Sequence, residues 1–147
     1  VAEIEGAFGR FLPWRFQDSP QVWIAGGIGI TPFLSAARSY GPDKPPVQLF
    51  YSVQTRAELI DQGALAEFLP KTYSDFKYFP YVNEEATGFL SAKYVDEQAG
   101  GLKGKEIFIC GPPPMMKAMR AQLRALGIPN NKIHSEEFSM SKDSKKL

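Results

Sequence analysis

The 147-residue sequence contains a single cysteine, Cys110, and a single histidine, His134. One cysteine excludes a disulfide bond within the chain and fits a reducing compartment. One histidine and one cysteine are too few for the ligand clusters that hold zinc, so we predict no metal site. We interpret His134 as a structural residue of a strand.

Long apolar runs and an excess of one charge are also lacking. No segment approaches the roughly 20 apolar residues of a membrane-spanning helix, and the first residues lack the pattern of a signal peptide. The net charge of +1 gives no basic footprint for nucleic acid. We therefore expect a cytoplasmic domain, or one on the cytoplasmic face of a membrane-anchored parent. Because the sequence opens in mid-pattern at Val1, we also expect it to be part of a longer polypeptide.

Short apolar segments alternate with segments of helical spacing along the whole chain. The apolar segments are rich in β-branched and aromatic residues, and Pro80 places the third of them nearer a sheet edge. We expect strands at residues 21–25, 47–53, 76–82, 106–110 and 132–138, and helices at 31–40, 61–69, 91–99 and 115–126. The alternation predicts an α/β fold of three layers, α/β/α, with a five-stranded parallel sheet in the middle.

A glycine-rich turn, AGGIGITP, follows the first predicted strand. Gly27 and Gly29 can adopt positive φ and have no Cβ to block a diphosphate, and Gly26 begins the same turn. We expect Thr31 to cap the next helix, with Pro32 in its first turn, so that free N–H groups point to the same place. The turn is interpreted as a diphosphate cradle. A tight turn without a ligand is the alternative, because the G-x-G-x-x-G fingerprint is incomplete.

A second turn of this kind, FICGPPPMM, follows the fourth predicted strand. Gly111 and Pro112 end the strand, and two further prolines fix the chain before a helix. Two such turns at one sheet edge predict a crevice that could hold a nicotinamide ring. For Cys110 the alternative is a buried small apolar residue. Helical spacing favours core packing for the methionines that follow, Met115, Met116 and Met119. The first of them, Met115, is also a nucleotide-binding candidate.

Four motifs carry a family resemblance: GGIGITPF, LFYSVQTR, IFICGPPPMM and IHSEEF. In this order they resemble the nicotinamide-nucleotide domain of the ferredoxin–NADP reductase superfamily, closest to its ferric reductase and NADPH oxidase-like branch or to flavohaemoglobin-type reductases. The opening IEGAFGRF resembles the last strand of that family's flavin-binding barrel. The resemblance thus implies a barrel end and linker at residues 1–19, an NAD(P)-binding domain at 20–140 and a flexible tail at 141–147.

The resemblance also implies a function. NAD(P)H would bind here and pass a hydride to FAD on a neighbouring domain of the same polypeptide, and electrons would then go to haem, an iron–sulfur centre or Fe(III). The diphosphate and its ribose would be held by Gly27, Gly29 and Thr31. The nicotinamide site would be lined by Cys110, Gly111 and Pro112. The catalytic candidates are Cys110 and Glu136, the latter near the flavin–nicotinamide contact, and Phe138 would pack at the flavin edge.

Residues at the end of the second predicted strand and just beyond it bear on the choice of nucleotide. Ser52 and Arg56 offer a hydroxyl and a guanidinium to a 2′-phosphate. No acidic residue ends this strand to bind a 2′-hydroxyl, so we expect NADPH rather than NADH. Gln54 departs from the pattern, since family members that prefer NADPH often carry Arg there. Alternatively, Arg56 pairs only with Glu58 or solvent.

Two other functions fit parts of the sequence. The chain could be a non-catalytic nucleotide-binding module with a regulatory role. It could also be a flavodoxin-like FMN binder, but that would need a hydroxyl-rich phosphate loop, and the first turn offers only Thr31.

Overall fold

The computed structural model describes residues 18–37, 44–60 and 76–137, with the backbone alone for Glu136 and Glu137. Several expectations lie outside these residues: the barrel-like opening, the helix at 61–69, Phe138 and the tail. The end of the helix at 31–40 also lies outside them.

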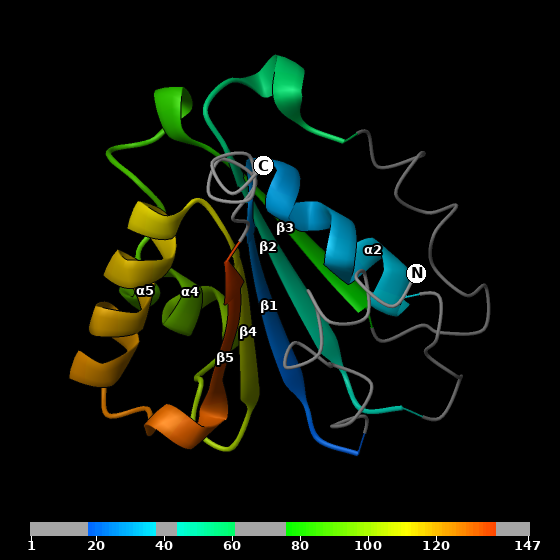
Figure 1. The fold of residues 1–147 in the computed structure, drawn as a ribbon, viewed down its shortest axis with the longest axis vertical. Coiled ribbons are helices and arrows are strands. Elements are labelled where there is room, and N and C mark those ends of the chain that lie inside the picture. Colours follow the sequence, from blue (N-terminus) through cyan, green and yellow to red (C-terminus); the bar gives the residue numbers. More distant parts are fainter. Residues whose placement is uncertain (1–17, 38–43, 61–75, 138–147) are drawn as a thin grey trace, which may run out of the picture.

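The centre of the fold is a five-stranded sheet in the order β3-β2-β1-β4-β5, and every neighbouring pair of strands is parallel (Figure 1). The strands are β1 (Gln21–Gly26), β2 (Val47–Val53), β3 (Phe76–Val82), β4 (Glu106–Gly111) and β5 (Ile133–Glu137). The predicted sheet is confirmed, and Pro80 lies in the edge strand β3, where a missing N–H costs no ladder hydrogen bond.

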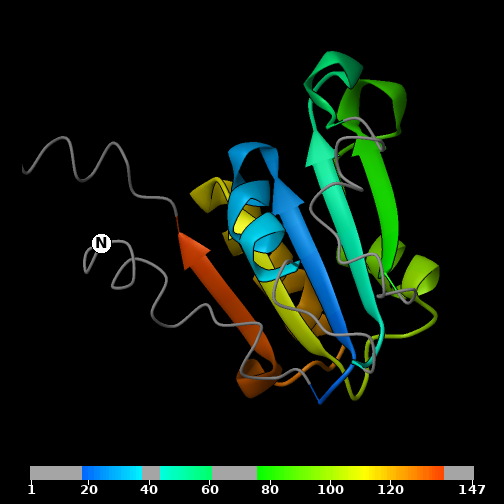
Figure 2. The same ribbon diagram turned by 90° about the vertical axis from the view of Figure 1, so that its right-hand side faces the viewer.

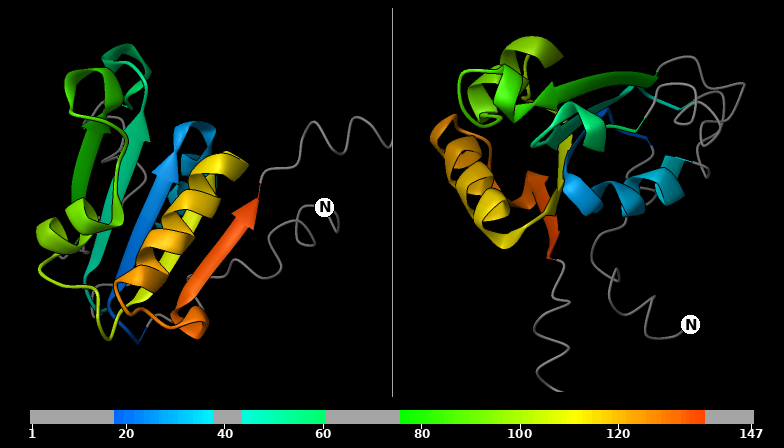
Figure 3. Two further views of the ribbon diagram at one scale, coloured as in Figure 1. Left: turned by 90° about the vertical axis from the view of Figure 1, so that its left-hand side faces the viewer. Right: turned by 90° about the horizontal axis from the view of Figure 1, so that it is seen from above.

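Helices cover both faces of the sheet, which confirms the predicted three layers. Helix α2 (Thr31–Ala37) lies on one face, and α4 (Ala92–Ala99) and α5 (Pro113–Ala125) lie on the other (Figures 2 and 3). In the described ranges, four short 3₁₀ segments connect the elements: η2 (Gly27–Ile30), η3 (Arg56–Glu58), η4 (Asn83–Glu85) and η5 (Asn130–Lys132). Within the described parts of the chain, no helix is both long and apolar enough to cross a bilayer.

The central strand β1 is buried along its whole length because both of its faces are covered. Trp23 faces the α2 side, where Phe33 stacks on its indole with ring centroids 5.2 Å apart. Val22 and Ile24 face the opposite side and pack in the cluster under α4 and α5. Two continuous apolar cores, one on each face, hold the carboxyl ends of the strands in fixed positions.

Helix starts differ from one another in how they are capped. The Ser91 hydroxyl accepts a hydrogen bond from the Tyr94 N–H at 3.1 Å, as an N-cap should. Thr31, by contrast, is not the predicted cap: its backbone is helical, and its hydroxyl donates to the Ile28 carbonyl at 3.2 Å. The reason is that η2 already provides a turn of helix before α2 begins, so the chain reaches Thr31 in helical conformation.

A buried carboxylate, Glu106, starts β4 at the amino edge of the sheet. It accepts hydrogen bonds from Lys132 Nζ and from the His134 ring nitrogen, each at 2.7 Å, and the His134 ring stacks on Phe108. Burial alone would raise the pKa of Glu106. The hydrogen bonds from Lys132 and His134 outweigh this effect and hold that pKa below its usual value. His134 therefore has the structural surroundings that were predicted for it.

Candidate functional site

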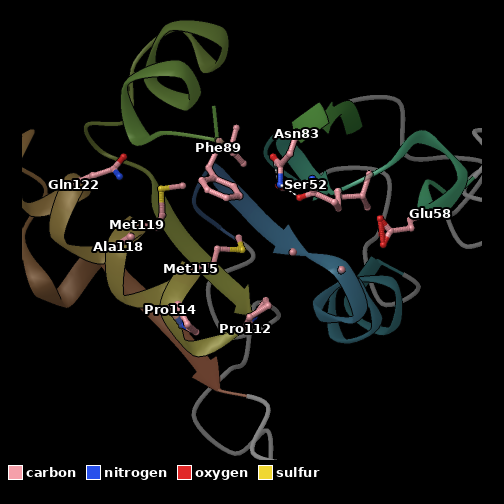
Figure 4. A pocket seen from close by; sticks show the side chains of 15 residues that line it. Ser52, Glu58, Asn83, Phe89, Pro112, Pro114, Met115, Ala118, Met119 and Gln122 are labelled. Atoms are coloured by element: carbon pink, nitrogen blue, oxygen red, sulfur yellow. Dashed lines mark hydrogen bonds between the residues drawn. The ribbon is translucent and has the colours of Figure 1, made fainter. Parts of the chain in front are cut away.

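A cavity of about 610 Å³ opens at the carboxyl edge of the sheet (Figure 4). Its volume suits a nucleotide-sized ligand. The ends of β1 and β2 and Pro112, directly after β4, form its floor, and the segment after β3 and one side of α5 form its walls. It is lined by Gly26, Gly27, Ser52, Val53, Gln54, Glu58, Asn83, Phe89, Leu90, Pro112, Pro114, Met115, Ala118, Met119 and Gln122.

The first glycine turn meets the cavity through Gly26 and Gly27. Gly27 has a φ of +55°, and a Cβ added there would have no neighbour within 4 Å, so glycine serves the backbone conformation and leaves open space. A Cβ on Gly26 would lie 2.2 Å from Met115 Sδ. The missing side chain at Gly26 therefore lets the second turn close against the first.

Gly29 differs from Gly27 in both its backbone and its position. Both glycines can adopt positive φ, but Gly29 does not use it, and it does not line the cavity. A Cβ on Gly29 would lie 2.1 Å from the Cys110 carbonyl oxygen and 2.9 Å from Gly111 Cα. Glycine is needed there because η2 packs directly onto the end of β4. Gly111 lies in the same seam, where its added Cβ would be 3.3 Å from Gly26 Cα.

Besides Gly29, the predicted residues Thr31, Pro32, Cys110 and Gly111 of the two turns also lie outside the lining of the cavity. Thr31 is exposed on α2 and Pro32 is buried in the first turn of that helix. Cys110 is completely buried in the core cluster on the α2 face, as the alternative interpretation expected. Glu136 pairs with Cys110 across β4 and β5, so the two predicted catalytic residues are neighbours in the sheet. Phe138 lies outside the described residues.

Polar groups gather where β2 and β3 end. The Ser52 hydroxyl donates to Asn83 Oδ1 and the Asn83 amide donates to Gln54 Oε1, both at 3.4 Å. Glu58 adds a carboxylate, held because its Oε1 accepts the Thr55 N–H at 2.8 Å in a capping box. No acidic residue ends β2 itself, but η3 turns the chain back and brings Glu58 to the cavity.

Arg56 does not join Ser52 at the cavity. Its guanidinium makes a two-pronged contact with the Glu85 carboxylate, with Nε donating to Oε2 at 2.7 Å. Hydrogen bonding within this pair raises the pKa of Arg56 and lowers the pKa of Glu85. Neither Glu58 nor solvent alone is its partner, so the pair links η3 to η4 instead.

The other end of the cavity is apolar. Phe89 is 78% exposed although it lines the cavity, and its ring stands opposite Met115 and Met119 of α5 (Figure 4). Sequence reasoning missed Phe89 and Gln122, for which no local pattern exists. It could have found Asn83, because that residue directly follows a strand at the ligand-binding edge. An exposed aromatic ring facing thioethers can stack on a flat heteroaromatic base.

These features define the class of protein. A parallel sheet covered on both faces, with two glycine turns and a cavity at its carboxyl edge, is a dinucleotide-binding α/β domain. The family described as the oxidoreductase NAD-binding domain matches residues 23–121, and the chain belongs to this family. The predicted membership of the ferredoxin reductase-like superfamily is thereby confirmed.

Individual relatives agree with this family. The chain is 30% identical to the anthranilate 1,2-dioxygenase electron transfer component of Acinetobacter baylyi, over 97% of this chain and 43% of the relative. It superposes on the Amycolatopsis cytochrome P450 reductase GcoB with a TM-score of 0.69 and 27% identity, over 86% of this chain and 40% of that one. It is also similar to the flavohaemoglobin of Malassezia yamatoensis, solved with bound FAD and haem (TM-score 0.66, 28% identity, 83% and 32% covered). The chain spans less than half the length of these relatives.

Proposed function

We propose that this chain is the NAD(P)H-binding half of a flavin-dependent reductase. Hydride would pass to FAD held by a neighbouring domain of the same polypeptide, and electrons would continue to haem, an iron–sulfur centre or Fe(III). The observation that carries the proposal is the cavity between two glycine turns at the carboxyl edge of the sheet. The similarity to an electron transfer component, a P450 reductase and a flavohaemoglobin supports it. The ferric reductase branch stays a prediction from the motifs.

The cavity suggests how the dinucleotide lies. The open space beside Gly27 suits the diphosphate, since no Cβ intervenes and the backbone can approach closely. The polar group of Ser52 and Asn83 suits the adenosine ribose, and the slot beside Phe89 suits the adenine. NAD(P)H supplies the hydride, and this domain binds and orients it. Cys110 and Glu136, paired in register, stay our candidates for the nicotinamide end. Residues 1–19 would continue into the FAD-binding barrel.

The nucleotide is better matched to NADH than to the NADPH expected from the sequence. The fixed carboxylate of Glu58 can accept a hydrogen bond from a 2′-hydroxyl, whereas it would repel a 2′-phosphate. Arg56 is directed to Glu85 and does not line the cavity. We therefore propose that NADH binds more tightly than NADPH.

Calorimetric titration of the chain with NADH and with NADPH tests both proposals. We expect NADH to bind about tenfold more tightly, which is the effect of one charge-assisted contact. Glu58→Gln should reduce the difference in affinity between NADH and NADPH. Glu84→Gln, a control in η4 and outside the lining of the cavity, should leave that difference unchanged. A tighter complex with NADPH would refute the preference for NADH. Failure of both nucleotides to bind would refute the proposed function itself.

A further inference from the structure

We infer that Gln122 selects the adenine base of the nucleotide by donating its side-chain amide N–H to a ring nitrogen of that base. The inference rests on the proposed function and adds a base-reading residue to it. Gln122 belongs to α5, and it lines the cavity at the end farthest from Glu58 (Figure 4).

A contact with α4 determines which way the Gln122 amide faces. The backbone N–H of Ala92, the first residue of α4, donates to Gln122 Oε1 at 2.8 Å. A backbone N–H can only donate, so the side-chain atom beside it has to be the oxygen. The oxygen is thus committed to the start of α4, and the nitrogen occupies the opposite side of the amide.

The nitrogen of Gln122 has no hydrogen-bond acceptor among the residues that the structure describes. Along α5, Gln122 follows Met115, Ala118 and Met119 at helical spacing, so these four residues share the face that borders the cavity. Met119 and Phe89 form the adjoining apolar walls. A base held between those walls would bring one of its edges to the amide of Gln122.

The chemistry of that amide restricts the base. The –NH₂ group offers only donors, so its partner has to be an acceptor in the plane of the ring. Adenine has three such acceptors, the ring nitrogens N1, N3 and N7. The Ala92 N–H prevents the Gln122 amide from rotating by half a turn, which would exchange its oxygen and nitrogen. Gln122 therefore presents a donor to the cavity and not an acceptor. The site therefore favours a base that presents a bare ring nitrogen there.

The test is a cycle between ligand and protein. AMP and its 1-deaza, 3-deaza and 7-deaza analogues, each lacking one ring nitrogen, are titrated into the wild-type chain and into Gln122→Glu. This variant keeps an oxygen for the Ala92 N–H but replaces the donor with an acceptor. Lys117→Gln is the matched control, since it also lowers the charge of α5 by one and Lys117 does not line the cavity.

We expect one deaza analogue to bind the wild type about tenfold more weakly than AMP, because one hydrogen bond is lost. Gln122→Glu should weaken AMP to a similar degree while binding that analogue as well as AMP, and its thermal unfolding should match the wild type. Lys117→Gln should retain the wild-type ranking. For each analogue, the affinity relative to AMP can be compared between the wild type and Gln122→Glu. If these relative affinities were the same in both proteins for all three analogues, the role of Gln122 would be overturned, and the proposed function would stand. Failure of the wild type to bind AMP and NADH at all would overturn the proposed function with it.

Discussion

Replacing Gly29 with alanine should destabilise the fold rather than simply block a ligand. The new methyl carbon would lie 2.1 Å from the Cys110 carbonyl oxygen, where side-chain carbons are essentially never found closer than 3.0 Å. The two segments would have to separate by about 1 Å. Both contacting groups are backbone, one in η2 and the other in β4, which pairs with the central strand β1. Neither can rotate away as a side chain would.

The cost can be set from measured overpacking. Extra methyl groups in tight cores cost roughly 1–3 kcal/mol, and the rigid backbone on both sides points to about 3 kcal/mol for Gly29→Ala. For a domain of this size that lowers the melting temperature by about 6–12 °C. Urea unfolding followed by circular dichroism measures the change directly.

The matched control is Gly104→Ala. Gly104 has a φ of +81° and open space around an added Cβ, so it tests backbone strain without a clash, at about 1 kcal/mol. If Gly29→Ala were no less stable than Gly104→Ala, the seam between η2 and β4 would not be as tight as the structure has it. In that case the interpretation from the sequence, in which Gly29 leaves room for a diphosphate, would be the better explanation of this glycine.

Two further predictions concern stability away from the cavity. Ser91→Ala removes the cap of α4 and should cost about 1 kcal/mol in urea unfolding, whereas AMP should bind the folded variant as before. Glu106 has a lowered pKa in the folded protein, so its contribution is present above the ordinary value of 4.5 and is lost as the pH falls through the lower folded value. Glu106→Gln should therefore lower the free energy of unfolding by about 2 kcal/mol near pH 7 and flatten its dependence on pH below 4.5. An equally steep acid dependence in this variant would contradict the role of Glu106.

Strand positions could be predicted from the sequence because local composition determines them. β2 and β3 have the expected bounds, and Pro80 correctly marked an edge strand. The rule that ligands bind at the carboxyl ends of parallel strands also predicted the position of the cavity from the sequence. These features depend on short-range patterns that recur in all folds of this class.

The individual roles at the site depended on contacts between distant segments, which the sequence does not display. Gly29 and Gly27 look alike in the glycine turn, but only the packing of η2 on β4 distinguishes them. Glu58 is five residues beyond the end of β2, and only the 3₁₀ turn η3 returns it to the cavity. The orientation of the Gln122 amide is determined by a hydrogen bond from Ala92, on another helix.

The walls of the cavity come from opposite halves of the sheet, with Ser52 and Asn83 at the ends of β2 and β3 on one side of β1, and Met115 and Gln122 in the helix that follows β4 on the other. A nucleotide spanning the cavity would act as a reversible cross-link between these halves. Since neither half alone can bind it, binding would be coupled to the complete fold. Saturating nucleotide at 100 times its dissociation constant would add about 2.7 kcal/mol against global unfolding. The same cavity would therefore form late in folding, once β1 has paired with both β2 and β4.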